Sequence, residues 1–254
     1  MKFVFTVLLL IASTLLLAQN ACAERSVPAL IDAIWKNDAA KVERLISQGV
    51  DVNVKHDDTA LVEAVSVDPK KINIEIVKML LNTKGIEVNK YSTRPMGSYS
   101  WYRTPLIAAV STGNVEAVKL LLAKGAKVNL VDQHLPVNVV FGPAPLNSAL
   151  MYAAEKGLFE IAELLLDKGA NIEQMNATGL TPLMFSVHIV TDKSDALTKE
   201  NAVKVAAVLL KRGAKVDNCG FSSNIKFLKV ALPKGTPSSV NPNVIVRGGG
   251  GISA

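Results

Sequence analysis

The chain has 254 residues, of which 49% are hydrophobic and 20% charged, a composition typical of a folded protein rather than a disordered one. Its formal net charge is +6, which raises the question of a nucleic-acid partner. The positive side chains are dispersed, however, and several, such as Lys124 and Lys168, directly precede glycines where helices are expected to end. Because they complement the helix dipole there, we expect no nucleic-acid partner.

Residues 1–23 have the parts of a secretory signal peptide. Lys2 supplies the positive start, residues 3–18 form an almost unbroken apolar run, and Ala21-Cys22-Ala23 is an A-x-A-like cleavage motif. We therefore predict cleavage between Ala23 and Glu24. Since the segment is similar to bacterial signal peptides, we expect the mature protein to be periplasmic or secreted.

Cys22 leaves a second possibility open, because it could carry the lipid of an outer-membrane lipoprotein. Against this, Gln19 stands where the lipoprotein motif has an apolar residue. An uncleaved anchor is a third possibility, although the apolar run is shorter than the ~20 residues of a typical membrane span. Membrane contact is expected only if Cys22 is lipidated. The other cysteine, Cys219, then has no disulfide partner within the chain, and we expect either a small buried apolar side chain or a reactive thiol.

From residue 27 onward, a pattern of two short helices recurs, and residues 104–129 show it best. Thr104 is a good N-cap followed by Pro105 at the first helical position, and Gly113 suits the left-handed conformation that ends a helix. Asn114 then caps a second helix. Each helix has about two turns, well under the ~12–15 residues that an isolated helix needs in water. The unit therefore requires neighbours of its own kind.

Five copies of Leu-x-x-Ala, Gly, Leu-Leu and Gly-Ala, complete or partial, follow one another in phase, near residues 27–57, 58–90, 103–130, 145–174 and 178–218. The pattern resembles the ankyrin repeat family, whose motif is Thr-Pro-Leu-His-x-Ala-Ala followed by Gly, Leu-Leu and Gly-Ala. The resemblance implies an all-α fold, a solenoid of about five helix-turn-helix repeats with β-hairpin or loop fingers between them. We expect this domain to span residues 24–232, with a C-terminal cap at 219–232 and a disordered tail at 233–254.

Three features of the repeats carry further expectations. The motif's His is replaced by Ile31, Val62, Ile107, Met151 and Met184, so apolar packing should substitute for the inter-repeat hydrogen bonds that the resemblance implies for this His. Trp35 is expected to cover the open end of the stack. Polar residues recur where each finger begins, and we expect turn and capping bonds to the nearby backbone; they are Asn53, Asn89, Asn129, Glu173 and Asp217.

Two connections are enlarged. Leu61 and Leu106 are 45 residues apart, and Leu106 and Leu150 are 44 apart, against a repeat period of about 33. The extra residues lie at 90–103 and at roughly 131–147, where ankyrin proteins place their fingers. Because successive fingers project from the same edge, the resemblance implies that these two insertions lie side by side.

The first insertion is unusually aromatic and basic. It holds four of the chain's 13 aromatic residues (7 Phe, 4 Tyr and 2 Trp). Tyr, Trp and Arg dominate binding hot spots, and loops often carry function. The alternative, that these side chains fold back over the groove between repeats, stays open. The predicted partner-binding residues are Tyr91, Arg94, Tyr99, Trp101, Tyr102, Arg103 and, from the second insertion, His134.

The sequence contains none of the motifs of a hydrolase elbow, a phosphate loop or a zinc protease, and His56, His134 and His188 are far apart. We therefore expect no enzyme activity, cofactor or metal, and a chain that is monomeric alone. The resemblance implies a scaffold that binds another protein, for example as an immunity or stress-protection factor or as a secreted effector. The alternatives are an enzyme or small-ligand site around Arg94, Arg103 and His134, and a structural envelope component anchored through Cys22.

Overall fold

The computed structural model describes residues 27–53, 58–67, 71–96, 99–136, 146–191 and 196–215. The predicted signal peptide with Cys22, the C-terminal cap with Cys219, and the tail all lie outside the described residues. So does His56. The described ranges therefore belong to the five repeats and the fingers between them.

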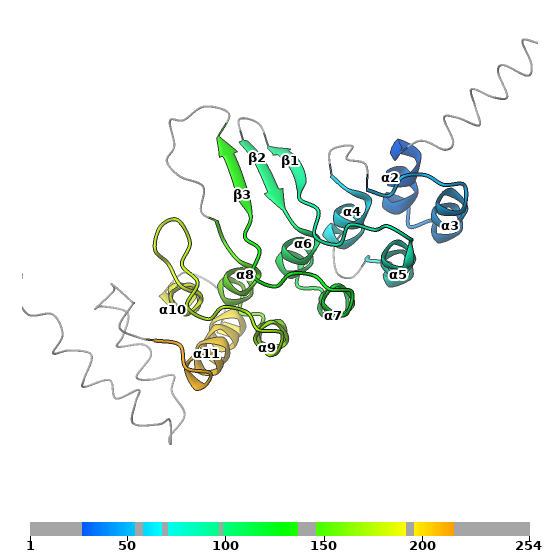
Figure 1. Cartoon of the computed structure of the whole chain (residues 1–254). Helices are drawn as coiled ribbons and strands as arrows, with labels where there is room; N and C mark the ends of the chain where they lie inside the picture. Colours follow the sequence, from blue (N-terminus) through cyan, green and yellow to red (C-terminus); the bar gives the residue numbers. More distant parts are fainter. Residues whose placement is uncertain are drawn as a thin grey trace, which may run out of the picture.

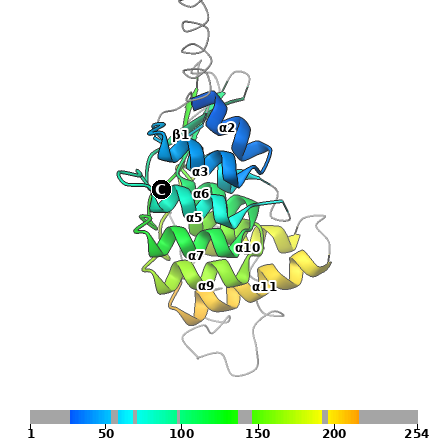
Figure 2. The same cartoon turned by 90° about the vertical axis from the view of Figure 1, so that its right-hand side faces the viewer.

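The helices alternate between two rows. The inner row lies on the side of the strands and the outer row on the other side, and each inner helix pairs with the outer helix that follows it (Figure 1). In Figure 2 the outer helices lie one above another along the stack. This architecture confirms the expected solenoid of helix-turn-helix repeats. The inner row is α2 Val27–Trp35, α4 Ala60–Ser66, α6 Pro105–Thr112, α8 Ala149–Glu155 and α10 Pro182–Thr191. The outer row is α3 Ala39–Ser47, α5 Ile74–Asn82, α7 Val115–Ala123, α9 Phe159–Asp167 and α11 Ala196–Lys211.

Local sequence signals set the ends of the helices in the best-matching repeat. The Thr104 hydroxyl accepts a hydrogen bond from the backbone N–H of Ile107, and the Asn114 side chain accepts one from Ala117 at 2.7 Å. Gly113 has φ +76°, the left-handed conformation that glycine adopts without strain. These predicted caps are confirmed.

A continuous apolar core joins the repeats, because buried side chains from both rows of helices contact one another from Leu30 to Ala214. Isolated helices of 7–9 residues, such as α4 and α7, are too short to be stable in water. Their stability therefore comes from packing against the neighbouring repeats, as expected for a solenoid.

The replaced histidines behave in two ways. Ile107 is 1% exposed and Val62 is fully buried, as expected for apolar packing. In the last two repeats, however, the thioether of Met151 accepts the backbone N–H of Ser148 at 3.3 Å, and that of Met184 accepts Thr181 N–H at 3.4 Å. These contacts are local to one repeat, so the expectation of apolar packing still holds for the fully buried Met151. The sulfur acts in addition as a weak acceptor at the helix start.

Trp35 does not cover the end of the stack. Its side chain is 62% exposed, and its indole Nε1–H donates to Glu63 Oε2 on α4, the next inner helix, at 2.9 Å. The expectation was wrong because the donor of the indole finds its acceptor in the neighbouring repeat, not at the open end.

The recurring polar residues join successive repeats. Asn89 Nδ2 donates to the Gly125 carbonyl at 3.3 Å, while its Oδ1 accepts Lys127 N–H at 2.7 Å. Asn53 and Asn129 make the same pair of bonds to the following repeat, and Glu173 Oε1 accepts Lys215 N–H. Bonding to the nearby backbone was therefore the wrong expectation, because these side chains reach 32 to 42 residues ahead. Asp217 lies outside the described residues.

Replacing Asn89 with alanine removes both inter-repeat bonds and is expected to lower the free energy of unfolding by about 1–3 kcal/mol, since one such bond contributes ~0.5–1.5 kcal/mol. Asn89→Asp keeps the acceptor and loses the donor, so its loss should be intermediate. Urea unfolding measures both. The control is Asn82→Ala on α5, an exposed asparagine whose bond to the next repeat goes to the flexible ammonium group of Lys124 and not to the backbone. Equal losses for Asn82→Ala and Asn89→Ala would contradict the role of the two backbone bonds.

Candidate protein-binding surface

The two enlarged connections meet in one small antiparallel sheet, which we call the finger sheet. It consists of β1 Ser92–Met96, β2 Tyr99–Arg103 and β3 Gln133–Pro136, in the order β1-β2-β3. The first insertion forms the β1–β2 hairpin, and the second adds β3 to β2. The sheet projects from the inner row of helices (Figure 1). The two insertions thus lie side by side, as expected.

The register of the finger sheet aligns three of the predicted binding residues. Arg94 pairs with Trp101, and Trp101 pairs on its other side with His134. Their backbones therefore form one row across all three strands. Tyr99 lies in a second row, between Met96 and Pro136. The side chains of residues 93–101 and 134–136 lie outside the described part of the chain, so the places of these residues on the sheet are given by the register alone.

Arg103 joins the finger sheet to the inner helices. Its guanidinium Nη2 donates to Ser66 Oγ, on the last residue of α4, at 3.4 Å. Alternate residues of a strand lie on the same face of a sheet, so Tyr99 and Trp101 share the face of Arg103 and Tyr102 belongs to the opposite face. The face that carries Tyr99 and Trp101 is therefore the one that continues onto α4.

Tyr91 connects the two insertions at the base of the finger sheet. Its side chain is half-buried, and its hydroxyl donates to the Val131 carbonyl in the second insertion at 2.8 Å. Burial, with a contribution from the negative charge of Asp132, raises the pKa of Tyr91. The structure thus gives this predicted binding residue a contact that holds the two insertions together. Tyr102 is also half-buried.

A buried carboxylate beneath the sheet escaped the sequence analysis. Asp132 is 1% exposed; its Oδ1 accepts Asn147 N–H at 2.6 Å, and its Oδ2 accepts the Tyr152 hydroxyl. Asn147 Oδ1 in turn accepts Asn176 Nδ2 at 2.9 Å. Burial, followed by the charge of Asp132, raises the pKa of Tyr152 well above its usual range. The network connects the residue before β3, the residues at the start of α8 and the following finger.

A signal for this network was present in the sequence. Ser92, Asp132 and Asn176 each lie three residues after a member of the recurring polar set, and all three are buried. Ser92 Oγ accepts the N–H of Thr59 at the start of α4, and so stabilises a helix start as Asp132 does. Polar residues at this spacing are also typical of turns, so the spacing alone did not identify these three residues as buried hydrogen-bonding groups.

The described part of this surface can make hydrogen bonds and apolar contacts. Within the ranges that the structure describes, no three His, Cys, Asp or Glu side chains gather in a way that could hold a metal ion. No helix in those ranges combines the length and the apolar character needed to cross a membrane.

Comparison with known proteins yields a family and one relative. A family model described as "Ankyrin repeats (3 copies)" matches residues 30–132 and 134–220, most of the chain. A phosphocholine transferase, AnkX, of Legionella pneumophila strain Philadelphia 1 is 26% identical over 189 residues, which is 74% of this chain. The chain spans only 17% of that protein's length.

Proposed function

Because this chain belongs to the ankyrin-repeat family, we propose that it is a non-enzymatic scaffold that binds another protein through the finger sheet and the adjoining inner helices. Ankyrin repeats generally act through contacts with other proteins. One observation supports this location above others: the row Arg94, Trp101 and His134 crosses all three strands of a sheet that projects from the helices. Trp and Arg are among the residues enriched at the centres of protein interfaces.

The contact surface that we propose consists of one face of the finger sheet and the adjoining helix α4. The Arg103 bond to Ser66 joins the face that carries Tyr99 and Trp101 to α4. A partner seated against this face would contact both the sheet and the inner helices, and so would bury more area than on either alone. In this proposal Tyr91 supports the sheet, and Arg94, Tyr99, Trp101, Arg103 and His134 supply the contacts. Tyr102, on the opposite face, lies outside this contact surface.

We also propose that the protein is exported, on the strength of the apolar segment and cleavage motif in residues 1–23. It then acts as a monomer in the periplasm or outside the cell. The activity of the Legionella transferase is not transferred to this chain, because the match covers 17% of that protein. The repeats are the shared part, and repeats are sufficient for a binding role.

Site-specific photo-crosslinking tests the location. A photoreactive phenylalanine is placed at position 101 of the full chain, in the cells that naturally produce it, and separately at Glu116, an exposed position of the outer helix α7. We expect a discrete cross-linked protein from position 101 and none from position 116, because only the first lies on the proposed face. Cross-links from position 116 alone would contradict the proposal and place the contact on the outer helices.

A further inference from the structure

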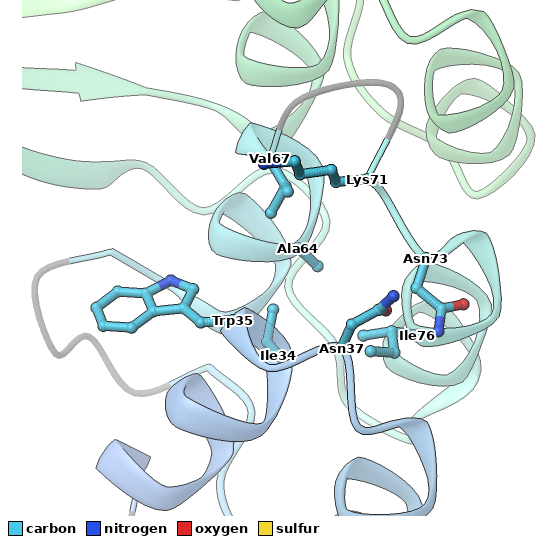
Figure 3. A pocket seen from close by; sticks show the side chains of 8 residues that line it. All are labelled: Ile34, Trp35, Asn37, Ala64, Val67, Lys71, Asn73 and Ile76. Carbon is cyan, nitrogen blue, oxygen red and sulfur yellow. The ribbon is translucent and has the colours of Figure 1, made fainter.

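A cavity of about 270 Å³ opens between the first and second repeats (Figure 3). Its floor is apolar and consists of the buried residues Ile34, Ala64 and Ile76. Its rim carries the exposed residues Trp35 and Lys71. We call this cavity the Trp35 pocket. It differs from the proposed finger-sheet site, which lies on the second to fourth repeats.

Trp35 is held in one orientation at the edge of the pocket. The indole is 62% exposed, so its apolar surface is open to contact with a ligand. Its Nε1–H donates to Glu63, which is only 6% exposed, so the ring is held in one orientation. A side chain that is already ordered loses little conformational entropy when a ligand packs against it.

The charge at the rim is positive. Among the residues that the structure describes, none forms an ion pair with Lys71, whereas the acidic side chains of α2 and α4, the inner helices that line the pocket, have donors of their own. Asp32 pairs with Lys36 at 2.8 Å, and Glu63 accepts the Trp35 indole. The Lys71 ammonium group is therefore available to a carboxylate that approaches the pocket.

The size of the pocket limits its occupant. Small-molecule and cofactor sites usually measure ~300–1,000 Å³ and enclose most of their ligand. This pocket is smaller and opens to solvent at its rim (Figure 3), so it suits one large apolar side chain that is anchored from outside.

We infer that the Trp35 pocket binds an acidic peptide segment of a partner protein. One apolar side chain of that segment, the size of leucine or phenylalanine, packs on the floor beside Trp35, and a neighbouring carboxylate pairs with Lys71. This inference goes beyond the proposed function, since it uses none of the finger-sheet residues.

The indole N–H resonance of Trp35 provides a direct test. The full chain, labelled with ¹⁵N, has two tryptophans, Trp35 and Trp101, and Trp35→Phe assigns their signals. The probe is the blocked peptide Gly-Ser-Phe-Glu-Ser-Gly. It should shift the Trp35 resonance saturably, with an affinity about fivefold higher than that of the same peptide with Gln for Glu, as expected for an exposed ion pair. A peptide with Ser for Phe should cause no saturable shift.

Two charge variants complete the design. Lys71→Gln should abolish the difference between the Glu and Gln peptides, while Lys84→Gln, at another exposed lysine beyond the pocket, should preserve it. The double change Tyr99→Ala and Trp101→Ala should leave the Trp35 response intact, which separates this inference from the finger-sheet proposal. A Trp35 resonance that stays unmoved at millimolar peptide, or a response indifferent to Lys71, would overturn the inference.

Discussion

Replacing Tyr152 with phenylalanine is expected to lower the free energy of unfolding by about 2–3 kcal/mol. The hydroxyl donates to Asp132, a carboxylate that is 1% exposed and beyond the reach of solvent. A buried charged group that loses a donor destabilises the fold by ~1–3 kcal/mol or more. Because phenylalanine keeps the ring and its packing, the loss reports the hydrogen bond. Urea unfolding near neutral pH measures it.

The control for this prediction removes the charge. In an Asp132→Asn background the group at position 132 is neutral, and leaving a neutral amide without the tyrosine donor has a smaller free-energy penalty than leaving a carboxylate without it. Tyr152→Phe should therefore destabilise this variant by about 1 kcal/mol less than it destabilises the natural chain. A double-mutant cycle gives the difference directly. Identical losses in the two backgrounds would show that the ring packing at position 152, and not the bond to the carboxylate, determines the effect.

The burial of Tyr152 also makes stability depend on alkaline pH. Burial raises the pKa of Tyr152 above its ordinary value, with a further contribution from Asp132. Above about pH 10 the unfolded chain releases this proton while the folded chain keeps it, so the free energy of unfolding falls with pH, by up to ~1.4 kcal/mol per pH unit. The stabilisation is fully present below about pH 10. In the Tyr152→Phe variant the free energy of unfolding should fall less steeply with pH. The smaller decrease due to Tyr91, whose pKa is also raised, should remain.

The largest functional effect is expected at the finger sheet. Changing Tyr99 and Trp101 together to alanine should weaken binding of the partner found by cross-linking at least about 100-fold, because two aromatic hot spots each contribute ~2 kcal/mol or more. Calorimetry with the purified partner measures the affinity. The thermal midpoint should change little, since the sheet projects from the helix stack (Figure 1).

Thr93→Ala combined with Ser100→Ala is the matched control. The register places both residues in the rows that alternate with those of Trp101 and Tyr99, and so on the opposite face. This variant should bind the partner within about threefold of the natural chain. A collapse of the thermal midpoint in the aromatic variant would instead support the alternative that these side chains cover the groove between repeats.

The short-range features of this protein follow from its sequence. Thr104, Gly113 and Asn114 define helix ends because each acts on backbone within a few residues, and such interactions do not depend on distant parts of the chain. The five-fold repetition likewise predicts the solenoid, since each hairpin must pack on its neighbours. The position of the two insertions, and their proximity, followed from the spacing of Leu61, Leu106 and Leu150.

The tertiary structure alone decided which distant groups meet. The pairing of Trp101 with His134, the bonds from Asn129 to the next repeat, the contact of Tyr152 with Asp132 and the bond from Trp35 to Glu63 join residues that lie 20 to 42 positions apart. A side chain such as asparagine or tryptophan has several possible partners, and sequence spacing does not rank them. The stacking of one repeat on the next fixes the distances, and those distances select the partner.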